Sequence, residues 1–137
     1  MTDVKPYEAF VVGDRKTFSK TITETDIGLF AGVSGDFYPL HVDAEYAKTT
    51  RFKQRVAHGM LTASLLSTVN GALIGIPGFY VSQTVNFRRP VFIGDTLTAT
   101  TEVVELIPAK RRMRCLTTIV NQRGETVLDG EAMTQKD

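Results

Sequence analysis

The chain has 137 residues, of which 42% are hydrophobic and 23% are charged, and its formal net charge is +1. This length predicts one domain, residues 1–137. The hydrophobic and charged fractions are those of a globular protein, which argues against disorder. The small net charge argues against steering of the whole molecule toward nucleic acid or an anionic membrane. The single cysteine, Cys115, indicates a reducing compartment. The polar start and the lack of a long apolar run predict a cytoplasmic protein without a membrane segment.

The first part of the chain predicts a strand followed by a helix. Residues 1–14 read as an extended lead-in and residues 15–23 as a strand. Thr23 and Asp26 form the pattern of a capping box ahead of apolar residues at helical spacing, so a helix is expected to begin there, with Gly35 as its stop.

The segment that follows is expected to be a stiff connection. Pro39 disfavours helical geometry at the residue before it, so residues 36–41 are predicted to form a rigid, non-helical turn. Asp43 is placed to cap a short helix that runs through Ala47, and residues 49–56 read as a polar connection.

The second half of the chain predicts one long helix and then strands. Residues 58–74 are almost all apolar or small, which is typical of a helix buried on most sides. Four later segments are enriched in Thr, Val and Ile and are separated by short turns, so we expect antiparallel strands at 80–88, 96–106, 111–121 and 126–135. The fold class is therefore α+β, an antiparallel sheet wrapped around a long central helix. Such a sheet leaves an edge and an open side, so we expect a homodimer.

Three residues that suit water chemistry beside a carbonyl stand out in the sequence. Asp36 and His41 supply a carboxylate and an imidazole five positions apart, and Gly59 opens the long helix. Such an acid–base pair can work near neutral pH. Free N–H groups at a helix start favour a developing negative charge, and glycine permits close approach. Each residue also has a structural reading, as a turn former, a hydrogen-bonded histidine or a packing glycine. Their combination favours catalysis, while His58 is expected to cap or orient the helix start.

Three segments together resemble the MaoC-like R-specific enoyl-CoA hydratases and acyl dehydratases. They are GDFYPLHVD at 35–43, AHGML at 57–61 and NFRRPVFIGDTL at 86–97. The resemblance covers nearly the whole chain and implies a hot-dog fold, a dimer or a dimer of dimers, and acyl-CoA substrates. It implies no cofactor, because coenzyme A is part of the substrate.

The reaction that the resemblance implies is the reversible hydration of short- or medium-chain trans-2-enoyl-CoA to (R)-3-hydroxyacyl-CoA. The implied catalytic residues are Asp36, which we expect to activate water, His41, which we expect to relay its proton, and Gly59, whose N–H stabilises the thioester oxygen. Tyr38, which stands where the family pattern has Asn, and Ser67 are the expected substrate-binding residues. The apolar acyl pocket is expected among Phe30, Leu40, Phe52, Ile76 and Phe79.

Other functions remain open at this point. A dehydratase acting on acyl carrier protein, a hot-dog thioesterase and a non-catalytic acyl-CoA binder are compatible with the same segments. The basic clusters at 88–89 and 110–114 predict solvated strand ends, with one or two arginines available for the phosphates of coenzyme A. No nucleic-acid motif accompanies them. The spacing of Asp36, His41, Asp43 and His58 matches no metal motif, so no metal is expected.

Overall fold

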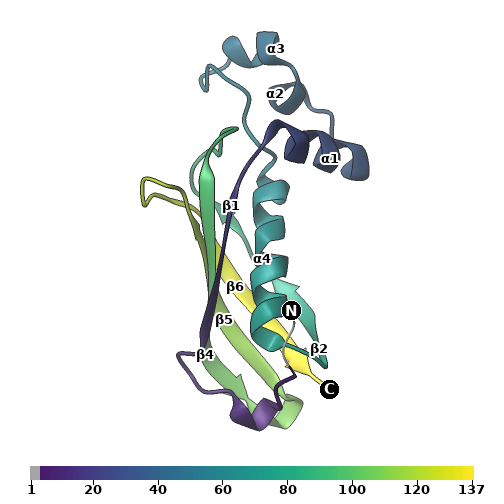
Figure 1. Ribbon diagram of the computed structural model, residues 1–137, viewed down its shortest axis with the longest axis vertical. Helices are drawn as coiled ribbons and strands as arrows, with labels where there is room; N and C mark the ends of the chain where they lie inside the picture. The colour runs from purple at the N-terminus through teal and green to yellow at the C-terminus, as the bar shows by residue number, and fades with distance from the viewer. Residues whose placement is uncertain (1–3) are drawn as a thin grey trace.

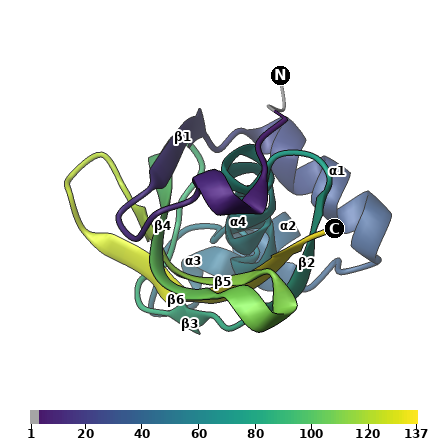
Figure 2. The ribbon, with the colours of Figure 1, turned by 90° about the horizontal axis from the view of Figure 1, so that it is seen from below.

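The computed structural model describes residues 4–137, in which one curled antiparallel sheet wraps around a long helix, α4 (Gly59–Ile74). Figure 1 shows α4 lying along the sheet, and Figure 2 shows the sheet curving around it. The sheet order is β1-β4-β5-β6-β2, with β3 paired to β6. The strands are β1 (Arg15–Thr21), β2 (Gly78–Gln83), β3 (Asn86–Phe87), β4 (Thr96–Ile107), β5 (Arg112–Val120) and β6 (Thr126–Lys136). The predicted α+β arrangement is confirmed.

Alternating apolar residues make the concave face of the sheet. Along the first part of β4 every second side chain is buried, among them Leu97, Ala99 and Val103. Successive side chains of a strand point to opposite faces, so this alternation lines one face with apolar groups. Leu66 and Val69 of α4 belong to the same buried cluster as Leu97 and Ala99. Burial of these apolar groups holds α4 against the sheet.

Both ends of α4 lie where the sequence predicts them. The helix begins after His58 and ends at Gly75, whose positive φ of 64° favours glycine. The buried Lys136 donates from Nζ to the carbonyl oxygen of Ile74 at 2.9 Å and so caps the helix end with a cation. Within residues 4–137, no helix is long and apolar enough to cross a membrane.

Helix α1 (Glu24–Ser34) carries the predicted capping box. The hydroxyl oxygen of Thr23 accepts from the N–H of Asp26 at 3.2 Å, and the Asp26 carboxylate accepts from the N–H of Thr23 at 2.8 Å. The helix stops at Gly35, which has a φ of 77°. This left-handed glycine turns the chain immediately before Asp36.

Three short helices gather beyond one end of the sheet, beside the start of α4 (Figure 1). They are α1, α2 (Pro39–Val42) and α3 (Ala44–Lys48). Arg55 links α1 to α2, because its guanidinium donates to the Glu24 carboxylate at 2.8 Å and its Nε donates to the carbonyl oxygen of His41 at 2.7 Å. This end of the molecule is therefore held together by polar contacts.

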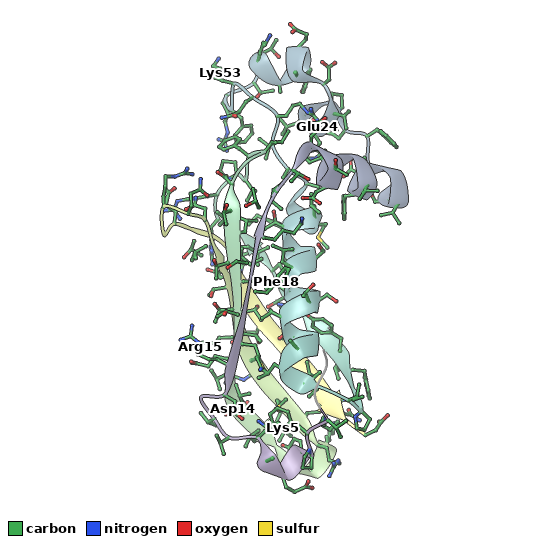
Figure 3. All side chains as sticks on the ribbon, in the orientation of Figure 1. Lys5, Asp14, Arg15, Phe18, Glu24 and Lys53 are labelled. Carbon is green, nitrogen blue, oxygen red and sulfur yellow. The ribbon has the colours of Figure 1, made fainter. Side chains whose placement is uncertain are left out.

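The opposite end of the molecule is formed by the lead-in and the first strand. A short 3-10 helix, η1 (Tyr7–Ala9), interrupts the extended lead-in that the sequence predicts, and residues 1–3 of that lead-in lie outside the described range. Lys5 pairs with Asp14 at 3.2 Å, and Figure 3 shows both side chains far from Glu24. The ion pair ties the lead-in to the start of β1.

Two sequence predictions about local structure are wrong. Residues 36–41 are partly helical, because Pro39 begins α2. Proline fits the first turn of a helix, where its missing N–H would have no partner. Residues 80–88 are not one strand, because β2 ends at Gln83 and β3 begins only at Asn86. Between them the carbonyl oxygen of Thr84 lies directly against Gly130 of β6, at a place where a Cβ atom would not fit. The N–H of Thr84 still donates to the carbonyl oxygen of Glu131 at 2.8 Å, so the pairing with β6 is irregular here and not lost.

Candidate active site

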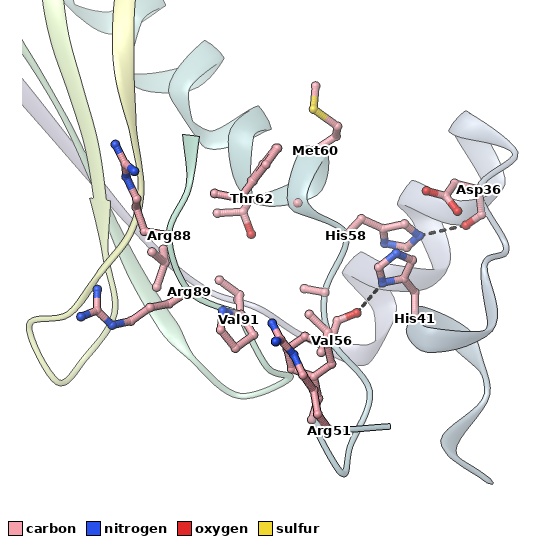
Figure 4. A pocket seen from close by; sticks show the side chains of 16 residues that line it. Asp36, His41, Arg51, Val56, His58, Met60, Thr62, Arg88, Arg89 and Val91 are labelled. Carbon is pink, nitrogen blue, oxygen red and sulfur yellow. Dashed lines mark hydrogen bonds between the residues drawn. The ribbon is translucent and has the colours of Figure 1, made fainter. Parts of the chain in front are cut away.

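Segments from three places in the sequence meet at the start of α4. Asp36 comes from the loop after α1, His41 from α2 and His58 from the residue that precedes α4. One carboxylate oxygen of Asp36 and one ring nitrogen from each histidine lie within 4.8 Å of one another. Figure 4 shows the two imidazole rings side by side. The structure therefore brings together the pair that the sequence singles out and adds His58 to it.

His41 is held by a bond that decides which of its nitrogens is available. Its Nδ1 lies 2.6 Å from the carbonyl oxygen of Val56 (Figure 4). A carbonyl oxygen only accepts hydrogen bonds, so Nδ1 carries the proton. In the neutral ring, Nε2 then has a free lone pair. His41 is therefore positioned to accept a proton at Nε2.

Asp36 lies in an exposed loop shaped by local hydrogen bonds. Its N–H donates to Ser34 Oγ at 3.1 Å, and its Oδ1 accepts from the N–H of Tyr38 at 3.1 Å. The second carboxylate oxygen has no bond to any described residue, so it is free to hold a water molecule. The turn-forming role and the chemical role of Asp36 are thus compatible.

Gly59 supplies unpaired donors at the first turn of α4. Among residues 4–137, the N–H groups of Gly59, Met60 and Leu61 form no hydrogen bond. These groups and the helix dipole favour negative charge at this point. A Cβ on Gly59 would lie 2.7 Å from Cε1 of Phe87, so any larger residue here would have to displace that aromatic ring.

A cavity of about 460 Å³ opens beside these groups. Its lining is formed by Asp36, His41, Arg51, Phe52, Val56, Ala57, His58, Gly59, Met60, Thr62, Phe87, Arg88, Arg89, Pro90, Val91 and Val127. Of the five apolar residues predicted for the acyl pocket, only Phe52 lines it. Ile76 and Phe79 follow the far end of α4, and Phe30 packs on His58 instead. The cavity lies at the helix start, not along the helix.

Two predicted substrate-binding residues, Tyr38 and Ser67, do not line this cavity in the single chain. The ring of Tyr38 lies 6.0 Å from that of His41, and its hydroxyl lies beside Tyr46, where this contact raises the pKa of the Tyr46 phenol. Ser67 is exposed on α4, two turns beyond Gly59. Their roles in binding stay predictions.

Arginines at the cavity differ in how they are paired. Arg88 donates to Asp129 at 3.0 Å, and Arg89 lies 3.6 Å from the Glu125 carboxylate. Arg51 forms no ion pair with residues 4–137, and its guanidinium lies 4.9 Å from the centre of the Phe52 ring. The sequence singles out residues 88–89 and misses Arg51. The cluster at 110–114 does not line the cavity.

Two buried polar atoms at the cavity have no hydrogen-bond partner, His58 Nδ1 and Thr62 Oγ1. Buried polar groups usually find partners, so such atoms point to a place where a ligand or water binds. Thr62 is a residue that the sequence analysis missed. Its one sequence signal is a hydroxyl four positions after His58, on the first turn of an otherwise apolar helix.

In the part of the chain that the structure describes, Asp36, His41 and His58 are also the one group whose donor atoms could hold a metal ion. Two imidazoles and a carboxylate are suitable ligands for several transition metals. Nδ1 of His41 and Nε2 of His58 are each bonded to a backbone carbonyl oxygen, which leaves Nε2 of His41 and Nδ1 of His58 as the free nitrogens. These free atoms suit either a metal ion or acid–base chemistry, and the chemistry proposed below needs no metal.

A curled antiparallel sheet around one helix, with an Asp–His pair at the helix start, defines a protein of the hot-dog class. The family model described as the MaoC like domain matches residues 11–126, and the chain belongs to this family.

Relatives support this assignment over nearly the full chain. An (R)-specific enoyl-CoA hydratase of Rhodospirillum rubrum is 46% identical over 127 residues, covering 92% of this chain and 88% of the relative. A 3-hydroxybutyryl-CoA dehydratase of Methylorubrum extorquens is 43% identical and covers 94% and 82%. The solved structure of an (R)-hydratase from A. caviae involved in PHA biosynthesis superposes with a TM-score of 0.91 at 37% identity, covering 95% and 99%.

Proposed function

We propose that this chain is a hydro-lyase that catalyses the reversible hydration of trans-2-enoyl-CoA to (R)-3-hydroxyacyl-CoA. The observation that carries the proposal is the placement of the Asp36 carboxylate and the free Nε2 of His41 beside the unpaired N–H of Gly59, all lining one cavity. Relatives named as an (R)-specific enoyl-CoA hydratase and a 3-hydroxybutyryl-CoA dehydratase support the reaction and the R configuration.

In the proposed mechanism a water molecule is held by two acceptors. The free carboxylate oxygen of Asp36 accepts one of its protons in a hydrogen bond, and Nε2 of His41 accepts the other. The water oxygen attacks C3 of the enoyl thioester while its proton passes to Nε2. His41 is thus the proposed base, in place of Asp36, which the sequence led us to expect in that role. Electrons of the C2–C3 double bond move onto the thioester oxygen.

The N–H of Gly59 stabilises the enolate that forms on the thioester oxygen, which is the role of an oxyanion hole. The His41 imidazolium then returns its proton to C2, so the ring becomes neutral and both elements of water have been added. The same steps in reverse remove water. None of them needs a redox or metal cofactor, because coenzyme A enters only as part of the substrate.

The substrate is proposed to be a short- or medium-chain acyl-CoA. A relative that is named for a four-carbon acyl-CoA, 43% identical over 130 residues, supports the shorter end of this range. An acyl group on a carrier protein is the alternative substrate. Kinetics with matched crotonyl thioesters of coenzyme A and of acyl carrier protein distinguish the two.

A second copy of the chain is proposed as the partner of the exposed edge of the sheet. The edge strand β2 exposes Phe79, Tyr80 and Val81, and Ser67 lies exposed on α4. An edge strand with exposed apolar side chains is a surface that proteins commonly cover. Light scattering coupled to size-exclusion chromatography tests for a homodimer.

The proposed location is the cytoplasm. The buried thiol of Cys115, which forms no disulfide, fits a reducing compartment.

The test of the proposed function is loss of the conjugated enoyl absorbance when purified protein is mixed with crotonyl-CoA. Asp36→Asn is expected to lose about 100-fold or more in kcat, since it keeps an oxygen for the Tyr38 N–H but no charge. The control Asp14→Asn removes a carboxylate at the opposite end and should retain full activity. Release of free thiol without hydration would replace the proposal with a thioesterase, and binding without turnover would replace it with an acyl-CoA binder.

A further inference from the structure

We propose that His58 is a positioning residue, which holds Asp36 and His41 in place relative to the amide of Gly59. The inference rests on the proposed hydratase function. It concerns a side chain that the sequence analysis expected only to cap or orient the helix start. The structure contradicts side-chain capping, because the ring of His58 makes no cap bond to the first turn of α4.

The ring of His58 is buried between the backbone of Asp36 and the ring of His41. The residue is 1% exposed. Its Nε2 lies 2.9 Å from the backbone carbonyl oxygen of Asp36, and its ring centre lies 4.1 Å from that of His41 with the planes inclined by 29°. Phe30 packs against it as well, with ring centres 4.8 Å apart. One imidazole thus contacts the backbone of Asp36 and the ring of His41 (Figure 4).

The hydrogen bond to Asp36 determines the tautomer of His58. Because the acceptor is a carbonyl oxygen, Nε2 must carry the proton, and in the neutral ring Nδ1 is bare. His41 has the opposite arrangement, with its proton on Nδ1. The two stacked rings therefore carry their protons on different nitrogens, a pattern that a measurement can detect.

The bond from His58 is the buried anchor of the Asp36 loop. The other bonds of this loop, from the Asp36 N–H to Ser34 and from the Tyr38 N–H to the carboxylate, are exposed to solvent. Exposed hydrogen bonds compete with water and restrain a loop weakly. The bond from a buried ring resists that competition, so it links the loop firmly to the core.

Stacking gives His58 its second contact with the site. A flat ring against the imidazole of His41 restricts rotation of that imidazole, whose Nδ1 is already bonded to Val56. His58 is also joined directly to Gly59, the first residue of α4. A single rigid segment therefore sets the position of the carboxylate, the base and the oxyanion donor relative to one another.

His58 is not itself the base in this proposal. Its Nε2 is occupied by the Asp36 carbonyl, and its Nδ1 is buried. Its loss should therefore misplace the reacting groups without removing any of them. Displacements of about 1 Å lower enzymatic rates by roughly 100-fold, and the effect should fall on kcat more than on KM.

Two variants separate the two contacts. His58→Phe keeps a flat ring to stack on His41 but cannot donate to Asp36, and we expect kcat for crotonyl-CoA to fall about 100-fold with KM changed less than about threefold. His58→Gln keeps an N–H donor in place of Nε2 and should recover at least about tenfold of that loss. Tyr7→Phe is the matched control. It removes one bond from a buried side chain to a carbonyl oxygen, that of Arg112, far from the site, and should keep full kcat.

The second measurement does not depend on activity. The chain has two histidines, so a long-range ¹H–¹⁵N spectrum of the wild-type protein contains signals from only two rings. We expect the Nε2–H tautomer for one and the Nδ1–H tautomer for the other, with His41→Asn removing the latter. Identical tautomers, or a folded His58→Phe variant with at least half the wild-type kcat, would overturn the proposal. If the wild-type protein lacks hydratase activity, the proposed function fails, and the spectrum still decides whether His58 holds Asp36.

Discussion

The Nδ1 atom of His41 lies 2.6 Å from the carbonyl oxygen of Val56, and this one contact leaves Nε2 as the free nitrogen of the ring. Val56 itself precedes the start of α4 and donates its N–H to the carbonyl oxygen of Leu40 at 3.2 Å. His41 thus donates to Val56, and Val56 donates to Leu40, the residue before His41. The orientation of the proposed base is set by backbone atoms and not by a neighbouring carboxylate.

We predict that His41→Asn folds but loses its catalytic function. The amide nitrogen of Asn can replace Nδ1 as a donor to Val56, while nothing replaces Nε2. The expected loss in kcat for crotonyl-CoA is about 100- to 10,000-fold, the usual range for a general base. The thermal midpoint of unfolding should stay close to the wild-type value. Retained turnover in this variant would exclude His41 from proton transfer.

Gly59→Ala tests two explanations for the glycine at once. The added Cβ would lie 2.7 Å from Phe87, so the ring must shift. Alanine keeps the backbone N–H, so the substitution acts by obstructing the approach of the thioester oxygen to that donor. We expect kcat to fall by up to about 100-fold, the loss seen when an oxyanion donor is out of reach. Steady-state kinetics of Gly59→Ala and of Gly59→Ala with Phe87→Ala give the answer. If the second substitution restores the rate, the glycine serves packing against Phe87 and not approach of the thioester.

Arg51 is predicted to contact a phosphate of the substrate, because it is the cavity arginine without an ion pair in residues 4–137. Arg51→Ala should raise KM for crotonyl-CoA about fivefold, corresponding to roughly 1 kcal/mol for an exposed charge pair, with kcat unchanged. The effect should weaken with added salt. Lys53→Ala is the control, because it removes an exposed cation that is near in sequence but does not line the cavity. An equal rise in KM for both variants would argue against a specific contact of Arg51 with the substrate.

Stability should depend on pH through Asp129. The guanidinium of Arg88 lowers the pKa of this carboxyl below its ordinary value. A pKa that is lower in the folded than in the unfolded state stabilises the fold above about pH 4, and this contribution is lost as the pH falls through the folded-state pKa. Asp129→Asn should therefore have a lower free energy of unfolding than wild type at pH 7, and the difference should shrink as the pH falls below about 4.

Urea unfolding at a series of pH values measures this difference. Glu102→Gln is the control, because Glu102 forms no ion pair with the described residues. A constant difference between Asp129→Asn and wild type across the whole pH range would show that the ion pair with Arg88 is not its source.

Removal of metal ions should leave activity unchanged. Asp36, His41 and His58 could supply ligands, but the proposed proton transfers use Asp36 and Nε2 of His41 directly. After dialysis against a chelator, kcat for crotonyl-CoA should remain within about twofold of the untreated value, since acid–base catalysis alone supplies the needed chemistry. Loss of activity that a divalent transition metal restores would instead make these residues a metal site.

The sequence alone determined the local features whose causes lie within a few residues. The capping box of Thr23 and Asp26, the stop at Gly35 and the bounds of α4 follow from side-chain and backbone chemistry at neighbouring positions. Alternation along β4 similarly identifies the buried face of a strand. The motif from Asp36 to His41 and the glycine at 59 pointed to the correct end of the central helix.

Only the tertiary structure decided the features that depend on segments far apart in the chain. The break between β2 and β3 arises where Thr84 crosses Gly130, which no local pattern signals. The bond from His58 to Asp36 joins residues 22 positions apart, and the cavity takes residues from both halves of the chain. Such contacts form because burial of apolar groups brings distant segments together, and this driving force is non-directional. The sequence therefore singled out the groups that are proposed to react, whereas folding decided which atoms of those groups remain free.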